Sequence, residues 1–131
     1  MNYFDTAHIY HDGKSELFLG KVLKKGYRDR VKIATKLPCF MVSKLQDAEK
    51  IFNTQLSRLQ TDHVDYYLLH MLTDVDALER LKSIGIFEWI ESKKKSRQII
   101  NFGFSFHGNK GGFVRLIDAY DWDICQNNTI F

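Results

Sequence analysis

Val64-Asp-Tyr-Tyr-Leu-Leu-His70 is an apolar, strand-forming run that ends on a histidine, and it indicates the fold. A similar run, Val31-Lys-Ile-Ala-Thr-Lys36, ends on a lysine. Three further strand candidates are Asn2–Asp5, Ile99–Phe104 and Trp122–Gln126. Between the five lie the amphipathic stretches Ser15–Lys25, Ser43–Leu59, Asp74–Lys95 and Asn109–Ala119. Strands that alternate with helices at this spacing predict parallel βα units, here an α/β fold with five parallel strands in an open curved sheet.

Local signals mark the ends of the predicted elements. Ser15 and Ser43 are plausible helix N-caps, because a serine hydroxyl can accept from an unpaired backbone N–H of the first turn. Gly26 fits a helix end, where glycine adopts a left-handed conformation most easily. The single proline, Pro38, suits a loop after the strand that ends at Lys36.

Bulk composition limits the functional class. The chain has 131 residues, of which 44% are hydrophobic and 27% charged, as in a soluble single-domain protein. The net charge of +3 and the Lys93–Lys95 run, a solvated helix end, give no reason to expect a nucleic-acid partner. No apolar run reaches the roughly 20 residues of a membrane span, and no secretory signal precedes the first strand. We therefore expect no membrane partner. Cys39 and Cys125 lack metal-ligand spacing, so we expect them to be reduced thiols in a cytoplasmic protein.

Polar residues terminate all five predicted strands: Asp5, Lys36, His70, Ser105 and Gln126. In parallel βα barrels the carboxyl ends of the strands line the active site, so these groups are expected to share one polar mouth. Tyr10 follows the first strand closely in sequence. An acid, a phenol, an amine and an imidazole can together deliver a proton to a carbonyl oxygen.

Several motifs in order resemble the aldo-keto reductase family. They are Phe4-Asp-Thr-Ala-His-Ile-Tyr10, Gly13-Lys-Ser-Glu16, Thr35-Lys36, Tyr66-Tyr-Leu-Leu-His70 and Gly103-Phe-Ser105. The resemblance extends over residues 2 to 126. The runs Phe104–Gly108 and Asp121–Gln126 are most similar to a bacterial branch whose members carry a ferredoxin-like tail, and this chain has no such tail.

The resemblance implies a catalytic tetrad of Asp5, Tyr10, Lys36 and His70. Tyr10 would be the general acid, assisted by Lys36 and Asp5, because a nearby cation stabilises a phenolate. His70 would orient the carbonyl of an aldehyde or ketone substrate. The family draws its hydride from NADPH, and residues at the positions of Ser105 and Gln126 hold the nicotinamide amide. Phe106 stands where the family commonly has an asparagine that also contacts the cofactor.

The resemblance also implies a partial TIM (β/α)8 barrel. A closed barrel needs about 250 residues, so residues 1–131 would form a single truncated domain with strands two to six. The late loops that hold the cofactor phosphates would be missing, which predicts weak NADPH binding and little activity. The inner face, with Ile33, Tyr66 and Leu68, would meet water, and the open edges would favour a homo-oligomer.

Three alternatives remain open. The chain could be a catalytically silent, self-associating half-barrel or a decayed gene product, which NADPH binding would distinguish from a reductase. His8 and His11 could join Asp5, His70 and His107 in a metal site, although this spacing is a weak signal and we expect no metal. The tail Asn128-Thr-Ile-Phe131 can be encoded so that a shift of one base gives Ile-Gln-Tyr, the family's usual continuation. A frameshift after Gln126 is one hypothesis for this tail, and a chance match is the other.

Overall fold

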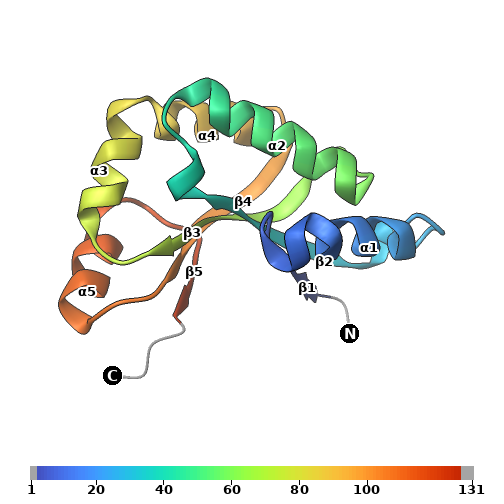
Figure 1. The fold of residues 1–131 in the computed structure, drawn as a ribbon, viewed down its shortest axis with the longest axis horizontal. Helices are drawn as coiled ribbons and strands as arrows, with labels where there is room; N and C mark the ends of the chain where they lie inside the picture. Colours follow the sequence, from blue (N-terminus) through green and yellow to red (C-terminus); the bar gives the residue numbers. More distant parts are fainter. Residues whose placement is uncertain (1–2, 128–131) are drawn as a thin grey trace.

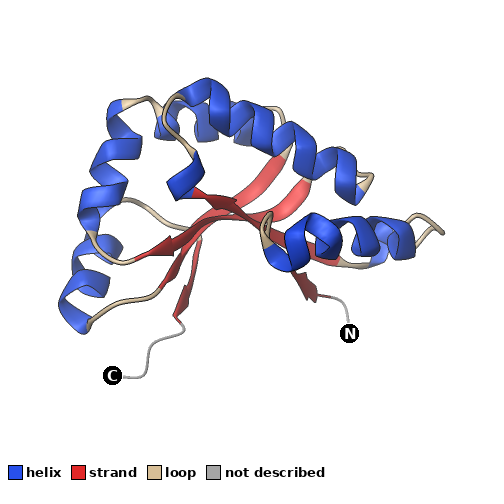
Figure 2. Cartoon of the chain, in the orientation of Figure 1, coloured by secondary structure: helices blue, strands red, loops and turns tan. Residues whose placement is uncertain are grey.

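The computed structural model describes residues 3–127 and contains one parallel five-stranded sheet in the order β1-β2-β3-β4-β5. The strands are β1 (Tyr3–Asp5), β2 (Lys32–Pro38), β3 (Val64–Leu72), β4 (Ile99–Phe106) and β5 (Ile124–Asn127). The sheet curves into an arch with β1 and β5 as its two feet (Figure 1). Every helix lies on the convex side, as Figure 2 shows by colour. The predicted open, partial barrel is therefore confirmed.

Five α-helices connect and cover the strands. They are α1 (Lys14–Leu23), α2 (Leu45–Leu59), α3 (Val75–Ser83), α4 (Ile86–Lys95) and α5 (Lys110–Ala119). Short 3-10 turns occur at η1 (Tyr10–Gly13), η2 (Arg28–Arg30) and η3 (Cys39–Met41). The prediction of one helix over residues 74–95 is wrong, because Gly85 adopts φ +93° and separates α3 from α4. A left-handed residue cannot continue a right-handed helix.

The predicted serine caps are also wrong. Ser15 lies inside α1, where its hydroxyl hydrogen-bonds the Thr6 hydroxyl at 2.7 Å. At the start of α2, the Asp47 carboxylate accepts from the backbone N–H groups of Ser43 and Lys44 at 2.9 and 3.1 Å. A carboxylate satisfies both orphan donors there, so the Ser43 hydroxyl is not required.

Two other boundary predictions shift by a few residues. Pro38 is the last residue of β2 rather than part of a loop. A proline can occupy a strand end, where its missing N–H costs no ladder hydrogen bond. Helix α1 ends at Leu23, and Gly26, with φ +91°, lies in the turn that follows.

The hydrophobic core lies between the convex face of the sheet and the helices. Alternate strand residues point into it, including Ile33, Tyr67, Leu69, Phe102 and Phe104, each at most 1% exposed. Because side chains alternate across a sheet, the intervening residues face the concave side. The prediction that Ile33 lies on the inner face is wrong, since Ile33 belongs to this helix-covered core.

The concave face is less exposed to water than the sequence predicted. Leu68 lies on it and is nevertheless fully buried, while Tyr66 is half-buried and packs edge-on against Tyr3, with ring centroids 5.7 Å apart. Gln126 of β5 donates to Asp5 of β1 at 3.0 Å, across the inside of the arch. Curvature thus brings the two edge strands close enough for side-chain contact, and of the three predicted inner-face residues only Tyr66 meets water.

Three further sequence expectations concern the cysteines, a membrane span and the tail. Cys39 is buried and Cys125 half-buried, and both are free thiols. In the described part of the chain, none of the helices is both long and apolar enough to cross a membrane. The frameshift hypothesis concerns residues 128–131, which lie outside the described residues.

Candidate functional site

Lys36 is the centre of the polar group at the carboxyl edge of the sheet. Its position in β2 points it to the concave side, and it is only 1% exposed. The ammonium donates to both carboxylate oxygens of Asp5 at 3.1 and 3.0 Å and to the carbonyl of Thr6 at 3.0 Å. It also donates to the Tyr10 hydroxyl oxygen at 3.1 Å. That last bond does not use the phenol hydrogen, which stays available for another acceptor.

Tyr10 reaches Lys36 from an irregular segment between β1 and α1. His11 and Asp12, the next two residues, have positive φ values of 50° and 56°. The chain there reverses sharply, and Tyr10 is left 36% exposed at the rim of the arch. The Lys36 ammonium also lies 4.7 Å from the centroid of the phenol ring.

His70 enters the site from β3, next to an irregularity in the strand. The β3–β4 register shifts between Leu69 and Leu72, and Met71 has φ +57°. The His70 ring is nearly buried and packs edge-on against Tyr10, with centroids 5.7 Å apart. Burial, reinforced by the Lys36 charge and opposed by Asp5, lowers the pKa of His70 to about 4. The imidazole is therefore neutral at pH 7, and its Nδ1 has no hydrogen-bond partner among the described residues.

Ser105 and Gln126 are direct partners across the β4–β5 ladder. The Ser105 hydroxyl is buried and accepts from the Met71 N–H at 2.7 Å, so its own hydrogen remains a potential donor. The Gln126 amide donates to Asp5 at 3.0 Å and contacts the Tyr3 hydroxyl at 3.5 Å. A hydroxyl donor beside a carboxamide fits the carboxamide of a nicotinamide, provided that Gln126 releases Asp5.

The structure thus places all six predicted residues at one edge of the sheet, but it links them unequally. Asp5, Tyr10, Lys36 and Gln126 form one hydrogen-bonded chain. His70 joins it through its ring contact with Tyr10, and Ser105 contacts the backbone of Met71 instead. Phe106 lies outside this group and is fully buried in the core, with its ring 5.1 Å from Phe113.

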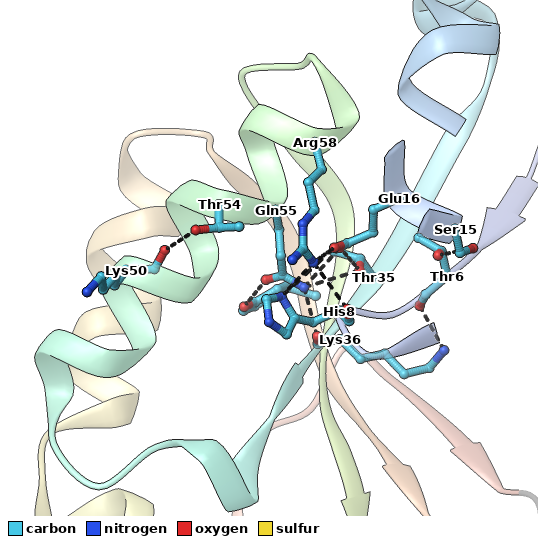
Figure 3. Close-up of polar contacts among 11 residues, drawn as sticks. Thr6, His8, Ser15, Glu16, Thr35, Lys36, Lys50, Thr54, Gln55 and Arg58 are labelled. Atoms are coloured by element: carbon cyan, nitrogen blue, oxygen red, sulfur yellow. Dashed lines mark hydrogen bonds and ion pairs between the residues drawn. The ribbon is translucent and has the colours of Figure 1, made fainter. Parts of the chain in front are cut away.

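A second polar cluster, which the sequence analysis missed, lies behind Lys36 on the helix side of β2 (Figure 3). We call Glu16, Thr35, Gln55 and Arg58 the buried hub. Glu16 accepts from Thr35 at 2.7 Å and from Gln55 and Arg58 at 3.1 Å each. One signal was present in the sequence: Gln55 interrupts the apolar stripe of α2, three residues after Phe52 and four before Leu59. A polar residue on a buried helix face needs partners, and that need points to a buried network.

The hub also decides against the metal-site hypothesis. The His8 Nδ1 atom lies 3.1 Å from Arg58 Nη1, so a cation already occupies the position that a metal ion would need on this ring nitrogen. Burial and the Arg58 charge lower the pKa of His8, although Glu16 opposes them. Within residues 3–127 no three His, Cys, Asp or Glu side chains are grouped as a metal site requires, so the proposed grouping of His8 and His11 with Asp5, His70 and His107 is wrong.

Comparisons of the sequence support a family assignment. The sequence profile of the Aldo/keto reductase family matches residues 1–119. "Probable aldo-keto reductase 1" of Glycine max is 27% identical over 122 residues, which is 82% of this chain and 35% of that protein. "Aldo-keto reductase family 7 member A3" of Homo sapiens is 45% identical over 71 residues, or 51% of this chain and 22% of that protein. The chain thus spans well under half the length of these relatives.

Solved structures agree with this result. An aldo-keto reductase from Klebsiella pneumoniae in complex with NADPH has a TM-score of 0.74 at 26% identity, covering 100% of this chain and 43% of that one. The holo form of an aldo-keto reductase from Bacillus halodurans has a TM-score of 0.80 at 26% identity, covering 98% of this chain and 44% of that one. With a profile match over most of its length and the same barrel segment, this chain belongs to the aldo/keto reductase family.

Proposed function

We propose that this chain carries the proton-donating machinery of an NADPH-dependent reductase of aldehydes or ketones. The observation that carries the proposal is the Lys36 ammonium, which lies 3.1 Å from the Tyr10 hydroxyl and 3.0 Å from Asp5. A phenol is a weak acid at neutral pH, with an ordinary pKa of about 10. An adjacent fixed cation stabilises the phenolate that remains after proton transfer.

Each of the four residues has a distinct role in this proposal. Tyr10 donates its free hydroxyl hydrogen to the carbonyl oxygen of the substrate. Lys36 compensates the developing phenolate charge, and Asp5 holds Lys36 in place through both carboxylate oxygens. His70 is neutral, so it can orient the carbonyl oxygen by a hydrogen bond without competing as the acid.

The cofactor would be held at the foot of the arch. Bound NADPH would supply the hydride, because side chains have none to give. Ser105 and Gln126 would hold its nicotinamide amide, and NADPH in the Klebsiella pneumoniae structure supports this choice of cofactor. Phe106 offers no side-chain hydrogen bond, and Gln126 has first to leave Asp5. Both features favour weak binding.

The test separates two candidates. Fluorescence titration with NADPH is expected to show weak binding, and little carbonyl reduction is expected. Any turnover that exists should be lost in Tyr10→Phe, because the proton donor is removed. Robust turnover that survives this substitution would defeat the assignment of Tyr10. The alternative, a catalytically silent half-barrel, is favoured by the Gln126–Asp5 contact, which occupies the cofactor-facing amide, and it predicts no NADPH binding at all.

The proposal extends to assembly and location. We treat residues 1–131 as a single domain, supported by one continuous hydrophobic core. Strands β1 and β5 have no neighbour on their outer sides in the described sheet, which favours pairing with a second copy of the chain. Light scattering at micromolar concentration should therefore show a dimer or larger species, and a compact monomer would contradict this.

Two free cysteines are consistent with a cytoplasmic protein.

A further inference from the structure

We propose that Glu16 is a positioning residue that holds Tyr10 and Lys36 at a fixed spacing, through contacts on the helix side of the sheet. The inference rests on the proposed function, because it concerns the same proton donor. The side chain of Glu16 touches neither Tyr10 nor Lys36, so the inference adds a residue that acts on the proton donor indirectly. Three observations support this inference: the few contacts of Tyr10, the position of Arg58 and the contacts of the two Glu16 oxygens.

The first feature is how little else holds Tyr10. Among the described residues, its hydroxyl has a single hydrogen-bond partner, the Lys36 ammonium that donates to it, and its backbone N–H donates to the Ala7 carbonyl at a long 3.3 Å. The segment around it belongs to no strand and reverses direction at His11 and Asp12. Such a segment needs an external support to keep one conformation.

Arg58 of α2 provides that support from both sides of the segment. Its Nη1 atom lies 3.1 Å from the His8 carbonyl oxygen and 3.1 Å from His8 Nδ1, and these two acceptors share its hydrogens with Glu16 Oε1. Because Arg58 is a donor only, Nδ1 must accept, which puts the ring proton of neutral His8 on Nε2. On the other side, a Cβ atom at Gly13 would lie 2.7 Å from the Arg58 guanidinium carbon. The guanidinium therefore lies against both ends of the segment that carries Tyr10.

The third feature is the division of labour between the two oxygens of Glu16. Oε1 accepts from Arg58, which holds the Tyr10 segment. Oε2 accepts from Thr35 and Gln55. Thr35 precedes Lys36 in β2, and Gln55 donates to the Lys36 carbonyl at 2.8 Å. One fully buried carboxylate thus joins the element that carries the phenol to the strand that carries the ammonium (Figure 3).

Tyr67 completes the support of the strand side. Its hydroxyl donates to Gln55 Oε1 at 2.6 Å, which fixes the orientation of the Gln55 amide. Burial, with the Glu16 charge adding to it, raises the pKa of Tyr67 well above its usual value. The phenol therefore stays protonated and keeps donating. Gln55 in turn presents its NH₂ group to Glu16 and to the Lys36 carbonyl.

The decisive variant is Glu16→Gln, because an amide can still accept from Thr35 while it loses the charge that holds Arg58. In NMR of the whole chain with labelled Tyr and His, the proton–proton cross-peak between the Tyr10 and His70 rings should disappear. Amide exchange in residues 8–13 should become about tenfold faster or more, since a hydrogen bond between charged groups is lost there. Amides of β2 should keep their protection.

Asp65→Asn is the matched control. Asp65 is also buried and paired with an arginine, Arg28 at 3.1 Å, and it accepts from the Ile33 N–H. This pair lies near the starts of β2 and β3, away from Tyr10. The control should lower global stability by a similar factor and keep the Tyr10–His70 cross-peak. A cross-peak retained in Glu16→Gln, or lost equally in Asp65→Asn, would overturn the proposal.

Arg58→Lys covers the case in which Glu16→Gln fails to fold. It keeps a positive charge beside Glu16 but lacks the planar guanidinium that lies against both His8 and Gly13, so the cross-peak should weaken and amides of residues 8–13 should exchange faster. An unchanged cross-peak here would also count against the proposal. These NMR measurements need neither cofactor nor turnover, so an absence of NADPH binding would count against the proposed function alone.

Discussion

The two faces of the sheet are built from alternate residues of the same strands, yet they have different tasks. The convex face is apolar, with Tyr67, Phe102 and Phe104 at most 1% exposed beneath the helices. The concave face carries Asp5 and Lys36 at one edge of the arch. A shift of one residue in register would exchange these two sets. Residues that stabilise the fold and residues that we propose to carry chemistry therefore alternate along each strand, and each set can be changed with limited effect on the other.

The buried hub is the exception that connects the faces. Thr35 points toward the helices and Lys36 toward the concave side, and they are adjacent in β2. Glu16 therefore acts on the site through the backbone of the strand rather than by direct contact. Glu16, Thr35 and Gln55 on the convex face are fully buried, and each is hydrogen-bonded, as buried polar groups require.

The largest expected difference between the faces is in packing. Phe102→Ala on the convex face should destabilise the protein by about 3–5 kcal/mol, because a large cavity forms in a closed core. Tyr66→Ala on the concave face should cost only about 1 kcal/mol, since Tyr66 is already half-exposed. Urea denaturation of both variants measures the difference. Equal losses would show that the concave face is as closely packed as the core.

The next effect is a dependence of stability on pH that arises on the concave face. His70 has a folded-state pKa of about 4, below its ordinary 6.5, so the folded state favours the neutral ring. The resulting stability is present above pH 6.5 and is lost as the pH falls toward 4. Its full size is about 3 kcal/mol, of which about 2 kcal/mol is lost by pH 5.

Denaturation at pH 7 and pH 5 tests this prediction. His70→Gln should remove most of the loss between the two pH values. The pKa of His8 is also lowered, so His8→Asn is the comparison that assigns the remaining part of the loss. A pH profile left unchanged by His70→Gln would show that His70 is hydrated in the folded state.

The smallest expected difference comes from removing a tyrosine hydroxyl on each face. Tyr67→Phe should cost about 1–3 kcal/mol, because it leaves a buried Gln55 oxygen without its donor. Tyr10→Phe should change stability by less than about 0.5 kcal/mol, since Tyr10 is 36% exposed and water can replace it. Thermal unfolding of the two variants decides this. A costly Tyr10→Phe would indicate that the phenol supports the fold as well as the site.

Much of this architecture could be predicted from local pattern. Strand–helix alternation predicted five parallel strands, and the polar strand ends predicted which side chains would meet. Local signals failed at two places where a neighbouring local feature prevailed. Gly85 breaks a continuous apolar pattern through its φ of +93°, and Asp47 replaces Ser43 as the capping group. Curvature of the sheet, which buries Leu68 and brings Gln126 to Asp5, leaves no trace in periodicity.

The order of the elements, the family and the six residues at the carboxyl edge follow from the amino-acid sequence, because each depends on short-range pattern or recognisable motifs. The contact between Glu16 and Arg58 follows from the folded arrangement, since they are 42 positions apart and come from two helices packed on the same side of the sheet. The same holds for the neutral state of His70, which follows from burial and from the charge of Lys36 in a neighbouring strand. Charge and desolvation act through space, so their effects appear only once the chain has folded.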